Sequence, residues 1–324
     1  MDRKVRWGVL GYAGIARNHV IPAMVNAENG EAFAIASRSR DKLKEALERF
    51  GFRKVYESYD KLLEDPEIDA VYIPLPNALH KEWAMKAAGH GKHVLCEKPL
   101  ALTGADCREL AEVFRQNRVK LMEAFMYRFL PGTVKLREIL DSGAIGQIRH
   151  IYSSHRFHLE NDGDVRVSRE LGGGCLRDVG CYPVNLVGWL LDSCPESVSA
   201  QKTMFQGVDH ALTACLKYKD GVMANISCGF DGCSVMVTEI NGTKGSILMR
   251  NTFIDSESPI LLFDAEGGMR EIPVETSQCY RLEVERFSAA VLEDRDMPLG
   301  LEESERNCRL MEEILRAAEA GGAR

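Results

Sequence analysis

Residues 5–16 read VRWGVLGYAGIA, a mostly apolar segment that runs into a glycine and then into a helical pattern. Val5–Leu10 has the composition of a short buried strand, and Gly11 follows it directly. Apolar residues then recur at helical spacing from Ile15 onward. A strand, a tight glycine turn and a helix in this order form the first unit of a doubly wound α/β sheet. This stretch therefore predicts an open parallel sheet with helices on its faces.

The same alternation of strands and helices continues to about residue 123, which predicts a Rossmann domain over residues 1–123. The further strands are expected at Phe33–Ser37, Val55–Tyr56, Ala70–Ile73, His93–Cys96 and Leu121–Ala124. The helices between them are expected at Asp41–Phe50, Tyr59–Leu63, Leu79–Ala88 and Thr103–Phe114. Parallel strands need such crossover helices, so the order of the elements indicates the α/β class.

Residues 124–324 differ in pattern and predict a second domain of the α+β class with a largely antiparallel open sheet. Extended segments are expected at 148–157, 197–203, 211–218, 221–229, 234–241, 245–249 and 260–263. Helices are expected at 133–142, 279–292 and 304–320. The last helix is expected either to stay with the second domain or to pack back on the first. We expect a cleft between the two domains.

The composition narrows the classes of partner. The net charge of −7 gives no electrostatic reason to expect a nucleic acid or an anionic membrane surface. No run of about 18 apolar residues occurs, so no membrane span is predicted. The chain enters its first strand pattern at once, so we expect no signal peptide and a cytoplasmic protein. The ten cysteines lack zinc-ligand spacing, which favours reduced thiols and predicts no metal site.

The glycine turn is the first candidate binding site. Its residues are Gly11, Tyr12, Ala13, Gly14, Ile15 and Ala16. Compared with the dinucleotide fingerprint Gly-x-Gly-x-x-Gly, the first glycine is present and alanines stand at the second and third positions. The helix that follows offers unpaired N–H groups and a positive dipole end to a pyrophosphate. We therefore predict that all six residues contact a dinucleotide; an ordinary strand-to-helix turn is the alternative.

The end of the second strand indicates which dinucleotide is preferred. An NAD site usually carries Asp or Glu there, to bind the ribose 2′-hydroxyl. Here the strand ends in Ser37-Arg38, with no acidic residue at its tip. A guanidinium pairs with a 2′-phosphate, and a serine hydroxyl adds a hydrogen bond. The sequence thus favours NADP over NAD, with a solvated arginine as the alternative reading.

Two more strands end at the same edge of the sheet, where ligands of open α/β sheets bind. The residues that follow them are Leu75, Pro76, Asn77 and His80 after the fourth strand, and Glu97, Lys98 and Pro99 after the fifth. We predict that Lys98 faces the nicotinamide and that its neighbours in both loops bind the cofactor. Pro99 restricts the backbone of Lys98 and makes a candidate cis peptide. A surface lysine beside a loop proline is the alternative.

With these motifs the chain resembles the Gfo/Idh/MocA family of oxidoreductases along nearly its whole length. The matching stretches are the glycine turn, 73–80, Glu97-Lys98-Pro99, 123–129, 142–146 and 172–185. Within the family the chain is most similar to the branch of dimeric dihydrodiol dehydrogenases and NADP-dependent D-xylose dehydrogenases. That branch has tyrosine where many members have the histidine of Asp-x-Gly-x-His, and here the motif reads Asp178-Val179-Gly180-Cys181-Tyr182.

The resemblance implies the catalytic roles. It implies that Tyr182 is the general acid/base on the reacting oxygen, and that Lys98 orients this oxygen and lowers the pKa of Tyr182. It also implies that Asp178 hydrogen-bonds a neighbouring substrate hydroxyl. From the residues alone, Asp178 and Tyr182 share a face if the segment is helical, and Pro183 places the helix start near 178–182. The alternatives are an N-cap role for Asp178 and a buried structural role for Tyr182.

Five further residues are expected to line the cleft. Arg166 matches a family arginine near the nicotinamide. Met126 and Arg128 follow the sixth strand, where Met126 is expected beside both cofactor and substrate. Phe157 and Tyr280 are expected in the wall of the substrate site. Dihydrodiol dehydrogenases carry an aromatic residue at the position of Met126, so the resemblance favours a sugar over an aromatic diol.

These features together predict an NADP-dependent dehydrogenase or reductase that acts on CH–OH groups. A hydride would pass between a secondary alcohol carbon of a sugar or cyclic diol and the nicotinamide, while Tyr182 handles the hydroxyl proton. Two alternatives are a keto-sugar reductase that works in the reductive direction and a catalytically silent NADP-binding regulator on the same fold. A small-molecule substrate and a homodimer or homotetramer are expected.

Overall fold

The computed structural model describes residues 3–160 and 163–321. Two compact units divide the chain: unit 1 consists of Met1–Met126 and Gln278–Glu305, and unit 2 of Tyr127–Ser277 and Arg306–Arg324. The expected boundary after residue 123 is thus displaced, and residues 278–305, expected in the second domain, belong to unit 1. A local hydrophobic pattern does not indicate which domain a later segment packs against. The placement of residues 278–305 was therefore not predictable from their sequence.

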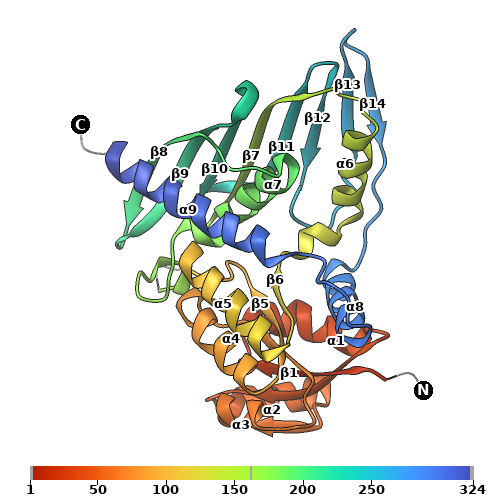
Figure 1. Ribbon diagram of the computed structural model, residues 1–324, viewed down its shortest axis with the longest axis vertical. Coiled ribbons are helices and arrows are strands. Elements are labelled where there is room, and N and C mark those ends of the chain that lie inside the picture. Colours follow the sequence, from red (N-terminus) through yellow and green to blue (C-terminus); the bar gives the residue numbers. More distant parts are fainter. Residues whose placement is uncertain (1–2, 161–162, 322–324) are drawn as a thin grey trace. The chain divides into compact units, whose positions relative to one another are not determined.

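Unit 1 contains a six-stranded parallel sheet (Figure 1). Its strands are β1 (Val5–Leu10), β2 (Gly30–Ala36), β3 (Lys54–Tyr56), β4 (Ala70–Ile73), β5 (His93–Glu97) and β6 (Leu121–Ala124). They lie in the order β3-β2-β1-β4-β5-β6, and all neighbours pair in parallel. The order reverses between β1 and β4, and ligands of such sheets bind at the carboxyl ends of the strands beside this reversal. The predicted Rossmann sheet is confirmed.

The helices of unit 1 begin and end where the sequence supplies suitable residues. They are η1 (Ala16–Val20), α1 (Ile21–Asn26), α2 (Arg40–Phe50), α3 (Tyr59–Leu63), η2 (Asn77–Leu79), α4 (His80–Gly89), α5 (Gly104–Asn117) and α8 (Cys279–Leu292). Helix α2 begins after Ser39, whose hydroxyl accepts a hydrogen bond from the Lys42 N–H, and it ends at Gly51 with a φ of +68°. Thr103 caps α5 in the same way, by accepting from the Asp106 N–H.

Helix α8 completes the core of unit 1. It packs against α1, β1 and β2. The Trp7 ring of β1 lies 4.9 Å from the Phe287 ring of α8, and the Trp7 Nε1–H donates to the Ser288 hydroxyl at 3.2 Å. Both aromatic side chains are fully buried. Burial of a large apolar side chain contributes roughly 1.5–3 kcal/mol, so these contacts stabilise α8 within this unit.

The expected helix 304–320 is α9 (Leu301–Gly321), and its residues are shared between the two units. The first turn belongs to unit 1, where Arg108 pairs with Glu305 at 2.7 Å. The residues from Arg306 onward belong to unit 2, where Arg306 pairs with Asp192 at 3.0 Å. The helix thus begins in unit 1 and continues in unit 2.

Unit 2 contains an eight-stranded sheet. Its strands are β7 (Ile148–His158), β8 (Ser197–Phe205), β9 (Val208–Lys217), β10 (Met223–Gly229), β11 (Asp231–Gly242), β12 (Gly245–Arg250), β13 (Ile260–Asp264) and β14 (Met269–Ile272). They lie in the order β14-β13-β12-β11-β7-β10-β9-β8, with β7 and β10 parallel and the other described neighbours antiparallel. The predicted fold class is confirmed. Strand β14 was not predicted, because it is a short and mostly exposed edge strand.

The segment of unit 2 that carries Asp178 and Tyr182 is helical. The helical segments not yet named are η3 (Met126–Phe129), α6 (Pro131–Asp141), η4 (Val165–Val167), η5 (Leu176–Gly180), α7 (Cys181–Leu191) and η6 (Lys219–Gly221). The single π-helical turn of η5 leads directly into α7. Pro183 is the third residue of α7, where a missing N–H is tolerated. The helix thus starts where the proline predicted, and α7 lies against β7 and β10.

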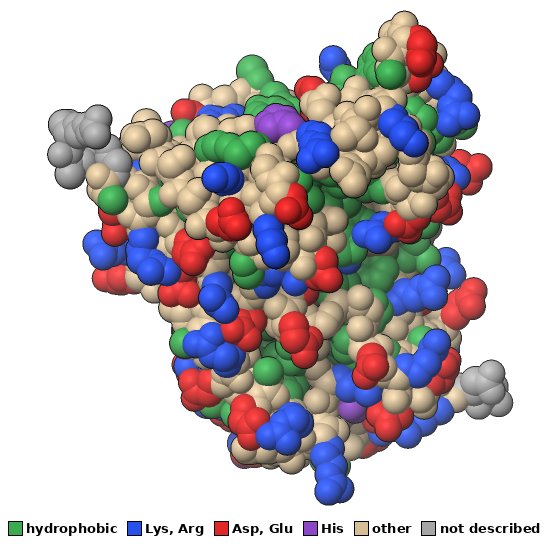
Figure 2. Space-filling view, turned by 45° about the horizontal axis from the view of Figure 1, so that its top comes forward, with side chains coloured by type: hydrophobic (Ala, Val, Ile, Leu, Met, Phe, Trp, Pro, Cys, Tyr) green, Lys and Arg blue, Asp and Glu red, His purple; other side chains and the backbone are tan. Residues whose placement is uncertain are grey.

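The surface carries charges of both signs. On the face shown in Figure 2, Lys and Arg side chains are interspersed with Asp and Glu, without an extended patch of one sign. Such a mixed face lacks the electrostatic footprint typical of nucleic-acid binding. Within residues 3–160 and 163–321, no helix combines the length and the apolar character needed to cross a bilayer.

Candidate active site

Gly11 makes the tight turn that follows β1. Its φ is +110°, and a Cβ there would lie 3.2 Å from Leu75 Cδ2 and 3.5 Å from the Tyr59 hydroxyl. Its N–H donates to the Ala36 carbonyl at 2.8 Å, which joins the ends of β1 and β2. Gly14 is exposed, and outside its neighbours and the backbone of its own helical turn no heavy atom of the described chain lies within 4 Å of a Cβ built on it. This open space suits the close approach of a pyrophosphate.

Tyr12 and Ala16 are anchored within unit 1. The Tyr12 hydroxyl donates to Glu45 at 3.2 Å, and its ring lies 6.4 Å from the Phe50 ring. Burial, followed by the charge of Glu45, raises the pKa of Tyr12. Ala16 is buried at the start of η1, as close helix–strand packing requires at this position of the fingerprint. The Tyr12 side chain is thus held by contacts within unit 1.

The two candidate residues at the end of β2 differ in accessibility. The Ser37 hydroxyl is buried and accepts a hydrogen bond from the Ser39 N–H at 3.2 Å. Arg38 is exposed beside Tyr59, whose pKa is raised by burial and lowered less strongly by the Arg38 charge. In the part of the chain that the structure describes, Arg38 has no carboxylate partner. Its guanidinium is therefore available to an anionic ligand.

His80 lies beneath the loops that follow β4 and β5. It is 0% exposed, with Nδ1 2.8 Å from the Pro99 carbonyl oxygen and Nε2 2.7 Å from the Leu75 carbonyl oxygen. Burial lowers its pKa. Both ring nitrogens face backbone carbonyls of the two loops, and the assignment of His80 to the cofactor site stays a prediction. The loop residues Leu75, Pro76 and Asn77 are half-buried.

Lys98 precedes a cis peptide bond to Pro99, the bond that the sequence singled out. The Lys98 N–H donates to the Glu97 carboxylate at 3.3 Å, and the Tyr72 hydroxyl donates to the same carboxylate at 2.6 Å. The Lys98 side chain is half-buried, and the Pro99 carbonyl faces His80. Tyr72 of β4, Glu97 of β5 and His80 of α4 thus hold the backbone around Lys98 in place.

Glu123, the third residue of β6, is a buried carboxyl near Lys98 that was not predicted as a site residue. It is 1% exposed, and its Oε1 accepts a hydrogen bond from the Leu100 N–H at 2.9 Å. Burial raises its pKa to about 7, while Ser304, Leu100 and the charge of Lys98 act in the opposite direction. A lone glutamate at the end of an apolar strand carries no sequence signal of such burial.

The raised pKa makes the stability of unit 1 depend on pH. The folded chain keeps the Glu123 proton up to about pH 7, whereas the unfolded chain releases it near 4.5. Between these values the folded state binds more protons at Glu123, so the contribution of this group to stability falls as the pH rises and levels off above about 7. We expect Glu123→Gln to remove this loss, which is on the order of 3 kcal/mol for the wild type. Urea unfolding at pH 5 and pH 8 measures the free energy of unfolding of both proteins. An equal fall between these two pH values in the wild type and the variant would contradict the raised pKa of Glu123.

Helix α8 places two more side chains in unit 1. Tyr280, predicted in the second domain, belongs to unit 1 and stacks on His19 of η1 at 4.8 Å. Glu283 is buried, and neither of its carboxyl oxygens has a hydrogen-bond partner within residues 3–160 and 163–321. Burial, and then the charge of Glu97, raises the pKa of Glu283 well above its ordinary value. Burial thus favours the neutral form of this carboxyl.

In unit 2, Asp178 of η5 binds Arg166 of η4. The Arg166 Nε–H donates to Asp178 Oδ2 at 2.8 Å, and Asp164 lies 3.2 Å from the Arg166 Nη1. Asp178, and then Asp164, raises the pKa of Arg166. Neither η5 nor α7 has a side-chain cap in the described structure, so the N-cap alternative for Asp178 is wrong. Gly173 is required here, because a Cβ would overlap the Arg166 carbonyl.

Tyr182, the second residue of α7, is 8% exposed and lies among aromatic rings. Its ring centroid lies 5.9 Å from Tyr127, 5.3 Å from His155 and 5.4 Å from Phe253. His155 and Phe253 were not predicted. The signal for His155 was present, since it stands two residues before Phe157 on β7, and side chains two apart lie on one face of a strand.

The remaining predicted wall residues have defined neighbours. The Arg128 guanidinium lies 4.2 Å from the Trp189 ring, and its Nη1–H donates to Asn185 at 3.4 Å. Phe157 lies 5.3 Å from the Phe230 ring. Met126 is buried at the end of unit 1. Unit 1 thus contains the candidate residues at the strand ends and Tyr280. Unit 2 contains the candidate residues of η4, η5, α7 and β7.

Two family models cover most of the chain. Residues 5–125 match the oxidoreductase family of Gfo/Idh/MocA proteins with an NAD-binding Rossmann fold, and residues 133–248 match the C-terminal domain of the same family. The chain belongs to the Gfo/Idh/MocA family. The resemblance seen in the sequence is thereby confirmed, together with the prediction of a nicotinamide-dependent oxidoreductase.

This Gfo/Idh/MocA protein is similar to enzymes with named activities. The D-xylose 1-dehydrogenase (NADP⁺) 2 of Haloferax volcanii is 36% identical over 322 residues, with 98% of each chain covered. A trans-1,2-dihydrobenzene-1,2-diol dehydrogenase of Xenopus laevis is 34% identical over 75% of this chain and 74% of its own. The crystal structure of a 3-ketoreductase from Actinomadura kijaniata with NADP and TDP-benzene has a TM-score of 0.92 and 32% identity, with 97% and 98% of the chains covered.

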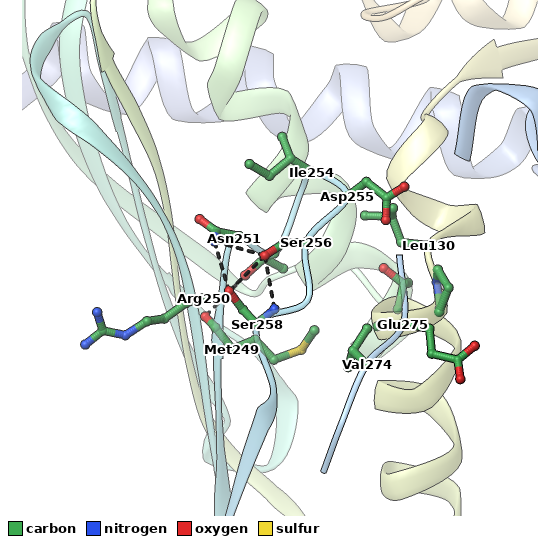
Figure 3. Close-up of a pocket in the computed structure, with 14 residues that line it drawn as sticks. Leu130, Met249, Arg250, Asn251, Ile254, Asp255, Ser256, Ser258, Val274 and Glu275 are labelled. Atoms are coloured by element: carbon green, nitrogen blue, oxygen red, sulfur yellow. Dashed lines mark hydrogen bonds between the residues drawn. The ribbon is translucent and has the colours of Figure 1, made fainter. Parts of the chain in front are cut away.

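A small cavity of unit 2 contains none of the predicted site residues of this Gfo/Idh/MocA protein (Figure 3). Its volume is about 20 Å³, which is room for roughly one water molecule. The Asn251 amide donates to Ser256 at 3.2 Å and to Ser258 at 3.0 Å, so these polar side chains satisfy one another. We assign this cavity no role. Within residues 3–160 and 163–321, no three His, Cys, Asp or Glu side chains gather as metal ligands do.

Proposed function

We propose that this protein is an NADP(H)-dependent dehydrogenase acting on a secondary alcohol of a sugar or cyclic diol. The observation that carries the proposal is the placement of Lys98 at the carboxyl end of β5, on a backbone fixed by Glu97 and His80. The xylose and dihydrodiol dehydrogenases among its relatives support this substrate class. The second candidate is a keto-sugar reductase, which the similarity to the 3-ketoreductase favours.

The residues around the glycine turn fit a dinucleotide. Gly11 and the open space beside Gly14 suit the pyrophosphate, and Arg38 suits a 2′-phosphate because no carboxylate competes for it in the described chain. When bound, NADP(H) supplies the acceptor or donor of the hydride. The further proposed contacts are Tyr12, Ala13, Ile15, Ala16, Ser37, Leu75, Pro76, Asn77, Glu97, Lys98, Met126 and Arg166.

We assign the proton-transfer step to Tyr182. Its hydroxyl takes the proton of the substrate alcohol in oxidation and returns it in reduction. A Lys98 ammonium at the reacting oxygen favours the phenolate form and brings the Tyr182 pKa closer to the working pH. Asp178, oriented by Arg166, accepts a hydrogen bond from a neighbouring substrate hydroxyl. The proposed wall of the substrate site is formed by Met126, Arg128, Phe157 and Tyr280.

The proposal is tested by following NADPH absorbance with a panel of pentoses, hexoses, cyclic diols and keto-sugars. NADP-dependent oxidation of a free sugar or diol supports the dehydrogenase. Turnover of keto-sugars alone, with NADPH, supports the second candidate. Measurable NADPH binding without turnover of any substrate overturns both and supports a silent regulator on the same fold.

Arg38→Ala tests the cofactor preference. The loss of a charge-assisted bond to the 2′-phosphate is expected to raise the Kd of NADPH about 10- to 100-fold and to leave the Kd of NADH within about threefold. Fluorescence titration measures both constants. Arg40→Ala is the matched control, since Arg40 is exposed nearby and already pairs with Glu57 at 2.8 Å. Equal losses in the two variants would contradict the assignment of Arg38.

We further propose a homo-oligomer, either a dimer or a tetramer, in the cytoplasm. Exposed apolar side chains on the sheet of unit 2 support self-association, among them Met204, Val235 and Met269. The cytoplasmic location rests on the spacing of the ten cysteines, which favours reduced thiols. Size-exclusion chromatography with light scattering measures the oligomeric state, and a monomer at micromolar concentration would contradict this part of the proposal.

A further inference from the structure

A fully buried histidine joins the two loops that carry the proposed cofactor and substrate contacts. His80 is the first residue of α4. Its Nδ1 lies 2.8 Å from the carbonyl oxygen of Pro99, which follows β5, and its Nε2 lies 2.7 Å from the carbonyl oxygen of Leu75, which follows β4. Strands β4 and β5 are neighbours in the sheet. One imidazole ring thus bridges two adjacent loops.

The two contacts make the same demand on one ring, because each needs a hydrogen-bond donor. A carbonyl oxygen only accepts hydrogen bonds, so each contact needs an N–H on the imidazole. The imidazolium carries two N–H groups and serves both loops, whereas the neutral ring carries one and serves a single loop. Burial, and to a lesser degree the charge of Lys98, lowers the pKa of His80 and favours the neutral ring. In the neutral ring, Leu75 and Pro99 therefore compete for a single proton.

We propose that His80 is a positioning residue that couples the Leu75–Asn77 loop to Lys98. The Nε2 contact fixes the carbonyl of Leu75, and with it the loop that is proposed to hold the cofactor. The Nδ1 contact fixes the carbonyl of Pro99, and with it the backbone next to Lys98. Because both carbonyls face one rigid ring, and share one N–H proton when that ring is neutral, a shift of one loop changes the hydrogen bond that the other loop receives. The inference rests on the proposed function, which assigns the cofactor to the first loop and the substrate oxygen to Lys98.

Two conservative variants separate the halves of this bridge. The amide nitrogen of Asn in H80N stands near the position of Nδ1 and keeps the contact to Pro99, whereas that of Gln in H80Q stands near Nε2 and keeps the contact to Leu75. We expect H80N to raise the Kd of NADPH about tenfold, with kcat at saturating cofactor within about threefold of wild type. We expect H80Q to lose about tenfold in kcat, with the Kd of NADPH within about threefold. H80L keeps neither contact and is expected to show both losses.

A merely structural histidine predicts no such split. Similar changes of Kd and kcat in H80N and H80Q would overturn the inference, and so would an H80L variant that keeps both constants. Thermal unfolding of the three variants accompanies the assay, and a common fall in Tm without the split counts against the inference.

A second readout keeps this test independent of turnover. If the wild type turns over no substrate of the panel, the proposed function fails and the Kd measurements still test the Leu75 contact. The rate at which trinitrobenzenesulfonate modifies the Lys98 amine, followed by peptide mass mapping, then replaces kcat. We expect this rate to change in H80Q and to stay at the wild-type value in H80N, and the reverse pattern would overturn the inference.

Discussion

Tyr182→Phe is expected to lower kcat about 10²- to 10⁴-fold while the Kd of NADPH stays within about threefold of wild type. The substitution removes one hydroxyl and keeps the ring, so the packing against Tyr127, His155 and Phe253 persists. A general acid/base contributes a factor of this size, because without it the alcohol proton has no positioned acceptor. Steady-state rates at saturating cofactor and fluorescence titration of NADPH measure the two constants.

Tyr218→Phe is the matched control for this substitution. Tyr218 is also buried in unit 2, and its hydroxyl has no hydrogen-bond partner within residues 3–160 and 163–321. Burial raises its pKa, so the group is a neutral phenol at working pH. We expect this variant to keep the wild-type kcat. Full activity of Tyr182→Phe, or equal losses in the two variants, would contradict the acid/base assignment.

The sheet of unit 1 was predictable because its signals are local. Short apolar strands, helices of regular period and the turn at Gly11 recur within a few residues of one another, and parallel strands require crossover helices. The return of α8 to this unit was not predictable in the same way. Its contact with β1 joins Trp7 and Ser288, which are 281 positions apart. An amphipathic helix packs equally well on many apolar surfaces, so its own pattern does not identify its partner.

The residue types of the candidate site were more predictable than their contacts. Strand ends at the carboxyl edge of the sheet pointed to Arg38 and Lys98, and the structure shows the first exposed and the second on a backbone held by Glu97. The partner of Asp178 was not foreseen, since its ion pair with Arg166 depends on how a short turn folds back. The contacts of His80 with the Leu75 and Pro99 carbonyls were not foreseen, because the sequence does not reveal how deeply a loop histidine is buried.

Gly174→Ala is expected to lower the free energy of unfolding by about 3–5 kcal/mol. Gly174 has a φ of +116°, which strains any L side chain, and a Cβ there would overlap the Asp209 carboxylate. Asp209 is buried and accepts hydrogen bonds from the Leu176 N–H at 2.7 Å and the Cys175 thiol at 3.2 Å. It therefore cannot move aside without releasing the first residue of η5, the turn that carries Asp178.

Gly207→Ala isolates the backbone part of this cost. Gly207 also has a positive φ, +83°, but beyond its own neighbours no heavy atom of the described chain lies within 4 Å of a Cβ built on it. We expect this variant to lose only about 1–2 kcal/mol, which is the strain of the left-handed conformation. Urea unfolding of both variants measures the difference. Equal losses would mean that the Asp209 carboxylate moves aside at no cost in free energy. The inference that this carboxylate anchors η5 would then be wrong. A larger loss in Gly174→Ala, accompanied by a fall in kcat, would show that the same anchor that stabilises unit 2 also holds Asp178 in position.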